Sequence, residues 1–301
     1  MIPLVTHPCY SFEFDSRHRF PMEKFRLLHE HLAAAGIAGA SNVYRPGVAK
    51  KEVLALAHCP DYLDRFIHNR QSKQELRRMG LPWSEGLVRR TLISPNGTLL
   101  AASLALQYGI ACHLAGGTHH AHYDFASGFC ILNDLVAASR ALVEQGKVER
   151  VLIFDCDVHQ GDGTAATLAN DARIFTCSIH CDKNFPARKA CSDLDVEVPS
   201  GAEDQVYLDF VESTLTTLIR QVKPQLVLYD AGVDIYAGDP LGLLQVSIAG
   251  IRERERLVLS ACQQHGIPVA TVIGGGYDDD RVALAQRHAI VVEEAHRMFK
   301  T

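Results

Sequence analysis

The sequence lacks repeats, low-complexity tracts and long runs of one charge, and no apolar segment approaches the length of a transmembrane helix. Residues 1–4 include no basic region followed by a long apolar stretch, so we expect no secretory signal. The nine cysteines are scattered without a pairing pattern, which is typical of proteins in a reducing compartment. We therefore expect a cytoplasmic protein without a membrane partner.

The chain also has no excess of positive charge, since 30 lysines and arginines stand against 35 acidic residues, for a net charge of −5. This balance argues against a nucleic-acid-binding surface and is compatible with a cationic substrate, such as a lysine side chain or a polyamine. The pair Arg77-Arg78 and the alternating run from Arg252 to Arg256 are predicted to be solvated helix faces.

Strand-like and helix-like patterns alternate along all 301 residues, and no linker interrupts them. With 47% hydrophobic residues, the chain can bury a large core. We expect one α/β domain spanning residues 1–301, although the length alone also allows two domains. The periodicity predicts amphipathic helices over residues 21–35, 202–222 and 247–265.

Polar residues follow the apolar run 151–154, which is typical of a buried strand. Asp155, Asp157 and His159 come directly after this run, and an alternating backbone would point all three to the same side. In open α/β sheets, ligands and catalytic groups collect where strands end. Two carboxylates and an imidazole at such a place favour a metal site.

The alternative is an ordinary turn, in which Asp162 caps a helix beginning at Thr164 and Asp155 accepts backbone amides. A second apolar run, 226–229, is followed by Asp234, which a loop could bring toward the first segment. Alone, Asp234 would be a turn aspartate. Together with Asp157 and His159 it completes three ligands and leaves a fourth position open, which is characteristic of a catalytic metal.

Two histidines, His119 and His120, follow a glycine turn. Adjacent side chains diverge on regular structure, so both can face one cavity only where the backbone is irregular. A single histidine is more often packed or solvated, and each catalytic imidazole needs a partner that fixes its tautomer. The remaining carboxylates of the first motif, Asp155 and Asp162, are the candidates.

A third apolar run, 269–273, ends in three glycines and Tyr277. The glycines allow a close approach of the backbone to a ligand, which would present the tyrosine hydroxyl beside the metal. Taken alone, this segment would be a loop with a half-buried tyrosine.

The sequence resembles the histone deacetylase family of the arginase/deacetylase superfamily between about Gly116 and Tyr277. The motifs that carry the resemblance are Gly-Gly-x-His119-His120, Gly128-Phe-Cys-x-x-Asn133-Asp134, Asp155-x-Asp157-x-His159-x-Gly161-Asp162-Gly163, Gly232-Val-Asp234 and Gly-Gly-Gly276-Tyr277. Gln160, and the segment from Asp234 to Gly242, are most similar to class IV deacetylases and their bacterial relatives. The chain departs from many members in having three glycines rather than four before the tyrosine, and in residues 278–280.

The resemblance implies a mostly parallel central sheet with helices on both faces, and a zinc-dependent deacetylase or deacylase. Asp157, His159 and Asp234 would hold Zn²⁺, with Fe²⁺ as a possible substitute. His120, paired with Asp162, would be the general base that activates water.

The family likeness also implies that His119 is an electrostatic partner paired with Asp155, and that Tyr277 donates to the amide oxygen. The implied substrate-binding positions, with Phe129 and Phe185 as aromatic walls and Leu241 as the lip, are Gly128, Phe129, Phe185, Leu241 and Gly275. A structural K⁺ or Na⁺ would be held by ligands that include Asp155 and Ser178.

The expected substrate is therefore an acylated lysine or polyamine, with no nucleic-acid partner. Two alternatives remain. One is a manganese ureohydrolase of the arginase type, which needs further carboxylates because it uses two metals. The other is a catalytically silent acyl-lysine-binding subunit. The length of the acyl group stays open.

Overall fold

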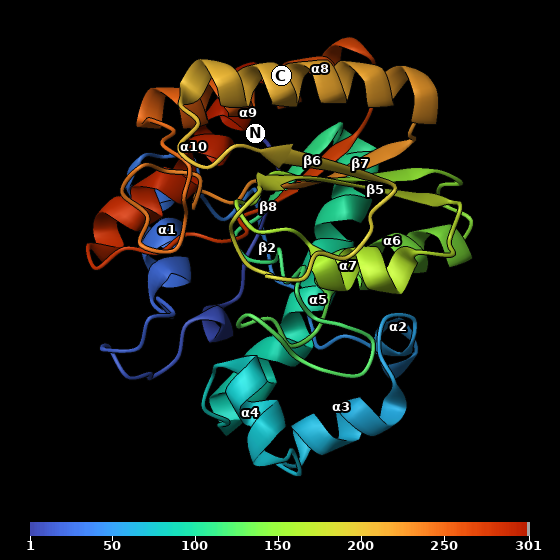
Figure 1. Cartoon of the computed structure of the whole chain (residues 1–301), viewed down its shortest axis with the longest axis vertical. Helices are drawn as coiled ribbons and strands as arrows, with labels where there is room; N and C mark the ends of the chain where they lie inside the picture. The colour runs from blue at the N-terminus through green and yellow to red at the C-terminus, as the bar shows by residue number, and fades with distance from the viewer. Residues whose placement is uncertain (300–301) are drawn as a thin grey trace.

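A central sheet of eight parallel strands organises residues 1–299, the part of the chain that the computed structural model describes. The strand order is β2-β1-β3-β8-β7-β4-β5-β6. In chain order the strands are β1 (Leu4–Val5), β2 (Val43–Tyr44), β3 (Ile110–His113), β4 (Val151–Asp155), β5 (Ile174–Cys181), β6 (Leu194–Val198), β7 (Leu226–Asp230) and β8 (Val269–Val272). The expected α/β fold with a parallel sheet is confirmed (Figure 1).

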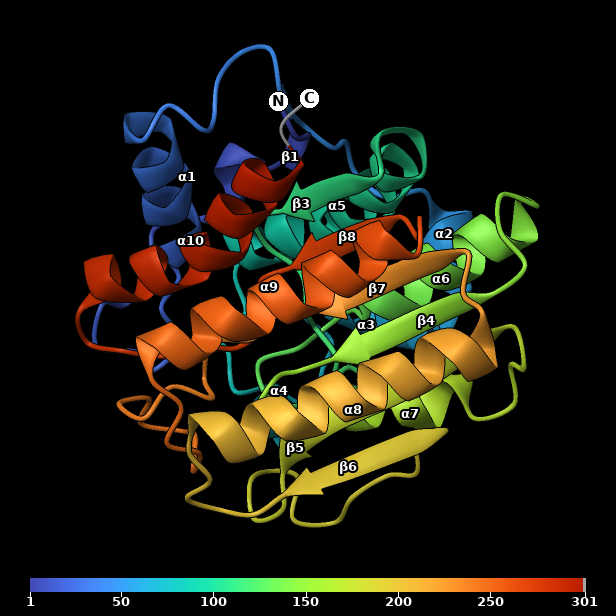
Figure 2. The ribbon, with the colours of Figure 1, turned by 90° about the horizontal axis from the view of Figure 1, so that it is seen from above.

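Helices cover both faces of the sheet, as expected (Figure 2). On one face lie α1 (Lys24–Ala34), α8 (Asp204–Val222), α9 (Ile248–Gln264) and α10 (Arg281–Met298). On the other face lie α2 (Lys51–Ala55), α5 (Glu85–Tyr108), α6 (Asp134–Glu144) and α7 (Asp162–Leu168). The two remaining helices, α3 (Pro60–Ile67) and α4 (Lys73–Met79), lie beyond the end of the sheet, and a short 3₁₀ turn covers Pro8–Tyr10 (Figure 1). No helix within residues 1–299 is long and apolar enough to span a bilayer.

The strands predicted from apolar runs are present with small shifts at their ends. Both β4 and β7 are buried along their whole length and extend one residue further than the apolar run, to Asp155 and Asp230. Because both faces of a parallel sheet are covered, such strands are continuously apolar rather than alternating. The predicted helices are also present, although α1 begins at Lys24 rather than at residue 21.

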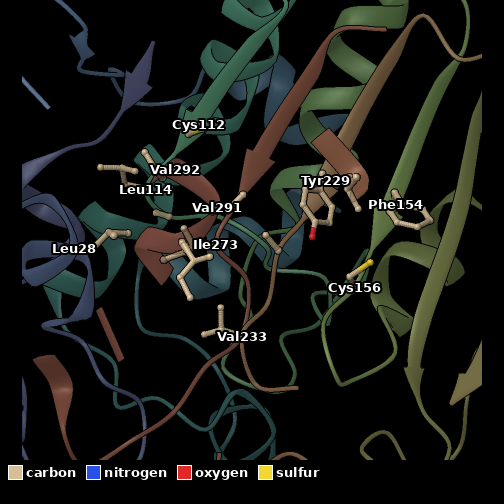
Figure 3. Packing of buried hydrophobic residues seen from close by; sticks show 14 of the residues in the cluster. Leu28, Cys112, Leu114, Phe154, Cys156, Tyr229, Val233, Ile273, Val291 and Val292 are labelled. Atoms are coloured by element: carbon tan, nitrogen blue, oxygen red, sulfur yellow. The ribbon is translucent and has the colours of Figure 1, made fainter. Parts of the chain in front are cut away.

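The core between the sheet and the helices α9 and α10 is built from aliphatic, aromatic and cysteine side chains (Figure 3). Phe154 on β4 and Tyr229 on β7 have ring centroids 6.3 Å apart. Cys156, just beyond β4, is fully buried in the same cluster, so it packs as a small apolar side chain (Figure 3).

The charged run on α9 is not a solvated face throughout, which corrects the expectation from its alternating signs. Arg254 and Glu255 are completely buried and bonded to each other at 2.5 Å. The Arg254 guanidinium donates to the carbonyl oxygens of Cys156 (3.1 Å) and Gly232 (2.7 Å). These carbonyls lie just beyond β4 and β7, where no strand partner satisfies them, and a buried carbonyl needs a donor. Arg254 therefore fixes the two segments that carry the candidate site.

We expect Arg254→Ala to lower the free energy of unfolding by about 3–5 kcal/mol, because Glu255 would be left as an uncompensated buried charge. Arg256 on the same helix is partly exposed and serves as the matched control. Arg256→Ala should cost about 1 kcal/mol or less. Urea denaturation measures both values, and a loss below about 1 kcal/mol for Arg254→Ala would contradict the proposed support role.

Candidate active site

The candidate site lies at the carboxyl ends of β4 and β7, which are neighbours in the sheet with Asp155 opposite Asp230. The strand conformation ends at Asp155, so regular alternation does not extend to Asp157 and His159 as the sequence had suggested. Tight local turns orient these residues instead. The amide of Asp157 donates to Asp155 Oδ1 (3.1 Å), and the amide of His159 donates to Asp157 Oδ1 (2.9 Å).

Asp157, His159 and Asp234 converge, and their potential ligand atoms lie within 4.8 Å of one another. His159 Nδ1 lies 3.1 Å from Asp157 Oδ1 and 3.1 Å from Asp234 Oδ2. Burial opposes protonation of His159, but the hydrogen bonds to the two carboxylates outweigh it and raise its pKa to about 10. The two buried carboxylates, Asp157 and Asp234, therefore strongly favour a positive charge between them.

Two glycines leave room for the carboxylates. A Cβ atom at Gly275 would lie 2.1 Å from Asp234 Oδ2, and one at Gly232 would lie 2.5 Å from Asp157 Oδ2. The amide of Gly275 donates to Asp157 Oδ2 at 2.6 Å, so this glycine contacts the acidic cluster directly. Two carboxylates and one imidazole form a donor set that suits Zn²⁺ or Fe²⁺. The residues present fit a divalent metal.

The irregular backbone needed to orient His119 and His120 together is a turn fixed by Asp134. Its carboxylate accepts the amides of Gly117 (3.1 Å) and Thr118 (2.7 Å). Gly117 has φ +77°, and a Cβ there would come within 2.5 Å of Asp230 Oδ2. The two histidine rings that follow have centroids 4.2 Å apart.

Each histidine pairs with one carboxylate. His119 Nδ1 lies 2.7 Å from Asp155 Oδ2, and His120 Nδ1 lies 2.6 Å from Asp162 Oδ1. Burial disfavours the charged form of both rings. At His119 the charges of Asp155 and Asp157 outweigh burial and raise the pKa well above its usual value. At His120 burial, followed by the charge of His119, lowers the pKa to about 4, so this ring is neutral near pH 7.

Asp162 lies inside α7, which begins at this residue and not at Thr164. It is therefore not the cap of that helix, because Gly161 occupies the capping position. Burial alone would raise the pKa of Asp162, but hydrogen bonds with His120 and His122 outweigh it and lower the pKa. His122, whose Nε2 lies 3.2 Å from Asp162 Oδ2, was not identified from the sequence, although its position two residues after His120 was a usable signal.

Tyr277 lines the same small cavity as Asp157, His159 and Asp234, so the shortened glycine run does not turn the ring away from the cluster. Its amide donates to Asp239 Oδ2 at 2.7 Å. Burial, followed by the charge of Asp234, raises the pKa of Tyr277 well above its usual value. The hydroxyl therefore stays protonated and able to donate. Sequence reasoning gave Asp239 no role.

The inner cavity, of about 40 Å³, and an open outer cavity of about 600 Å³ share the lining residues His120, Gly128, Phe129, His159 and Tyr277. We treat them as the two ends of one tunnel and call the outer cavity its mouth. Phe129 and Gly128 line both parts, whereas Phe185 and Leu241 line the mouth. The ring centroids of Phe185 and His120 are 4.9 Å apart. Phe129 has φ +65°, a left-handed conformation that costs a side chain of this size about 1–2 kcal/mol, and its amide donates to Met79 O at 3.1 Å. Backbone strain of this kind gathers at functional sites.

The predicted monovalent-cation residues are neighbours, and the side chain of each has a hydrogen-bond partner. Ser178 on β5 lies opposite Asp155 on β4. Its hydroxyl is 2.9 Å from His180 Nδ1, while Asp155 pairs with His119.

Two buried cations beside the inner cavity, Lys24 and Arg90, were not identified from the sequence, because lysine and arginine are rarely buried and their burial depends on tertiary contacts. Lys24 Nζ donates to the carbonyl oxygens of Gly274 (3.2 Å) and Gly276 (3.4 Å). Burial lowers the pKa of Lys24 to about 8 and that of Arg90 to about 10. Both contribute positive charge close to the acidic cluster.

A second group of possible ligands consists of His119, Asp155 and Asp230. Burial, followed by the charges of Asp155 and Asp157, raises the pKa of Asp230 well above its usual value. This group shares no residue with the first one.

Comparisons of the sequence with known proteins identify a family. A family model described as the histone deacetylase domain matches residues 18–292. An uncharacterized protein of Picosynechococcus sp. is 48% identical over 99% of both chains. Histone deacetylase 2 of Arabidopsis thaliana is 29% identical over 92% of this chain and 74% of its own length. Acetoin utilization protein AcuC of Staphylococcus aureus (strain COL) is 28% identical over 88% of this chain and 74% of its own length. The chain therefore belongs to the histone deacetylase family.

Proposed function

We propose that the protein is a metal-dependent hydrolase that removes an acyl group from a lysine-like amide, and that residues 1–301 act as one catalytic unit. One observation carries the proposal. Three metal-type donors, the His120–Asp162 pair and the Tyr277 side chain meet at one small cavity that Phe129 also lines. The family match supports the coarser assignment to a deacetylase-type hydrolase.

Asp157, His159 and Asp234 would hold the metal, which we take to be Zn²⁺ with Fe²⁺ as a substitute. When bound, such an ion supplies Lewis acidity for the carbonyl oxygen and makes water more acidic. The backbone amides around the cluster orient the carboxylates. Gly275 donates to Asp157, and the amide of Val158 donates to Asp234 Oδ1 at 2.9 Å.

His120 would act as the general base. Its Nδ1 is committed to Asp162, which fixes the tautomer and leaves Nε2 to take a proton from the attacking water. The lowered pKa keeps the ring neutral and ready to accept that proton. The same nitrogen can then return the proton to the departing amine, so that water and amide become acid and amine. His119, held positive by Asp155, would stabilise negative charge without moving a proton.

Tyr277 would donate its hydroxyl hydrogen bond to the oxyanion that develops on the carbonyl oxygen. The tunnel walls, Phe129 and Phe185, would align the aliphatic part of an acyl-lysine and exclude water from it. A monovalent cation near Asp155 and Ser178 is the remaining part of the proposal, and it would support the β4 end of the site.

The second group, His119, Asp155 and Asp230, is the feature that favours a two-metal ureohydrolase as the alternative. Two-metal centres place their ions about 3.5–4 Å apart, which shared carboxylates make possible. Here the two groups share no ligand, and His119 is already bonded to Asp155. The one-metal hydrolase is therefore favoured. A silent acyl-lysine-binding subunit would not require the His120–Asp162 pair.

We expect protein treated with a chelator to lose the ability to release acetate from a neutral acetyl-lysine peptide, and one equivalent of Zn²⁺ or Fe²⁺ to restore it. Asp234→Ala should stay inactive after the same treatment, because it removes one of three ligands. Asp209→Ala, an exposed change on α8, is the matched control and should behave as wild type. Full activity of Asp234→Ala would contradict the assignment.

Tyr277→Phe deletes the hydroxyl and keeps the ring and its packing. We expect kcat to fall by about 10²–10³-fold with a small change in KM, as for the loss of one oxyanion donor. Steady-state kinetics on the acetyl-lysine peptide measure both constants. A near-normal kcat would mean that another group stabilises the oxyanion.

A further inference from the structure

The mouth of the tunnel is positively charged, although the whole chain is negative. Its lining contains four arginine and lysine side chains and no carboxylate. These four residues, which we call the basic rim, are Arg19, Arg77, Arg78 and Lys183. All four are exposed. The net charge of −5 is therefore opposite in sign to the charge of the surface around the mouth, which a substrate contacts first.

The charges of the basic rim are not neutralised by the protein. Within residues 1–299, none of its four members forms an ion pair, and Arg78 instead stacks over the Phe125 ring at 4.4 Å. Exposed arginines elsewhere commonly have acidic partners, as Arg17 has Asp15. Uncompensated charges of one sign around a cavity attract ligands of the opposite sign.

The basic rim is attached to the two aromatic walls and so has a defined position relative to the tunnel. Arg77 and Arg78 form the last turn of α4, and the next residues, Met79 and Gly80, contact Phe129. Lys183 stands on the other wall, two residues before Phe185.

The loops that carry the rim are held in place. Asn184, next to Lys183, donates to Leu241 O at 2.6 Å and accepts from the amide of Leu243 at 3.0 Å. On the other side, His18 Nε2 bonds to Gly80 O at 3.1 Å, which ties the loop bearing Arg19 to α4.

We propose that the basic rim selects an acylated lysine within a protein segment whose neighbouring side chains are acidic. This inference rests on the proposed function, which places the acyl-lysine in the tunnel. Cations on both walls fit a chain that crosses the mouth with carboxylates on either side of the lysine. A free acyl amino acid would offer its carboxylate to one side only, and a polyamine would be repelled.

The test measures binding of fluorescent acetyl-lysine peptides by anisotropy, with glutamate, glutamine or lysine flanking the acetyl-lysine. It uses metal-loaded Tyr277→Phe protein, because slow turnover leaves the peptides intact while binding is measured. At low ionic strength the glutamate peptide should bind about tenfold or more tightly than the lysine peptide, since several exposed ion pairs contribute together. The difference should shrink as salt is added. Equal affinities, or a preference for the lysine peptide, would overturn the proposal.

Variants of the basic rim test whether its charges cause the preference for the glutamate peptide. Arg77→Gln combined with Lys183→Gln should reduce the glutamate preference several-fold. Arg220→Gln, which removes an exposed arginine on α8 outside the mouth, should preserve it. A preference unchanged in the double variant would count against the rim. Tight competition by free acetyl-lysine or by an acetylated polyamine would count against a protein segment.

Hydrolysis of the glutamine-flanked peptide by the wild-type protein distinguishes a failure of this inference from a failure of the proposed function. Hydrolysis without any preference among the peptides would defeat the basic rim alone. A glutamate preference in binding, with no hydrolysis of any peptide, would support the rim and count against the hydrolase.

Discussion

Several buried carboxylates at the carboxyl ends of β4 and β7 set the constraint on which the rest of the site depends. Asp155, Asp157, Asp230 and Asp234 are each at most 2% exposed. Buried carboxylates are expensive unless positive charge or hydrogen-bond donors compensate them. The surrounding structure supplies both, through protonated or cationic side chains and through glycine amides that approach without a Cβ in the way.

The charge of the site differs in sign between the inner cavity and the mouth. Close to the reacting atoms, the acidic cluster attracts a cation, and Lys24 and Arg90 limit the excess of negative charge. At the mouth, the sign reverses, and the basic rim faces solvent. A net charge taken over the whole chain averages these regions and cannot predict either one.

Much of the fold and of the site could be predicted from sequence because short motifs follow apolar strands. The parallel sheet brings the ends of β4, β7 and β8 together, so Asp157, Asp234 and Tyr277 meet without any detail of the loops. The alternation argument was nevertheless wrong beyond Asp155, since local turns and not a strand orient His159.

Residues whose roles depend on tertiary contacts could not be predicted. Arg254 and Glu255 resemble an exposed charged run, and only the position of α9 over the unpaired carbonyls beyond β4 and β7 makes burial favourable. Lys24 likewise sits on an amphipathic helix, and its burial depends on the glycine segment that packs over it.

The most direct test of the central claim is an anomalous difference map from crystals grown with Zn²⁺ or Co²⁺. The account predicts one strong peak about 2.0–2.2 Å from donor atoms of Asp157, His159 and Asp234. No peak at this place with saturating metal, or two peaks about 3.5–4 Å apart, would contradict a one-metal hydrolase.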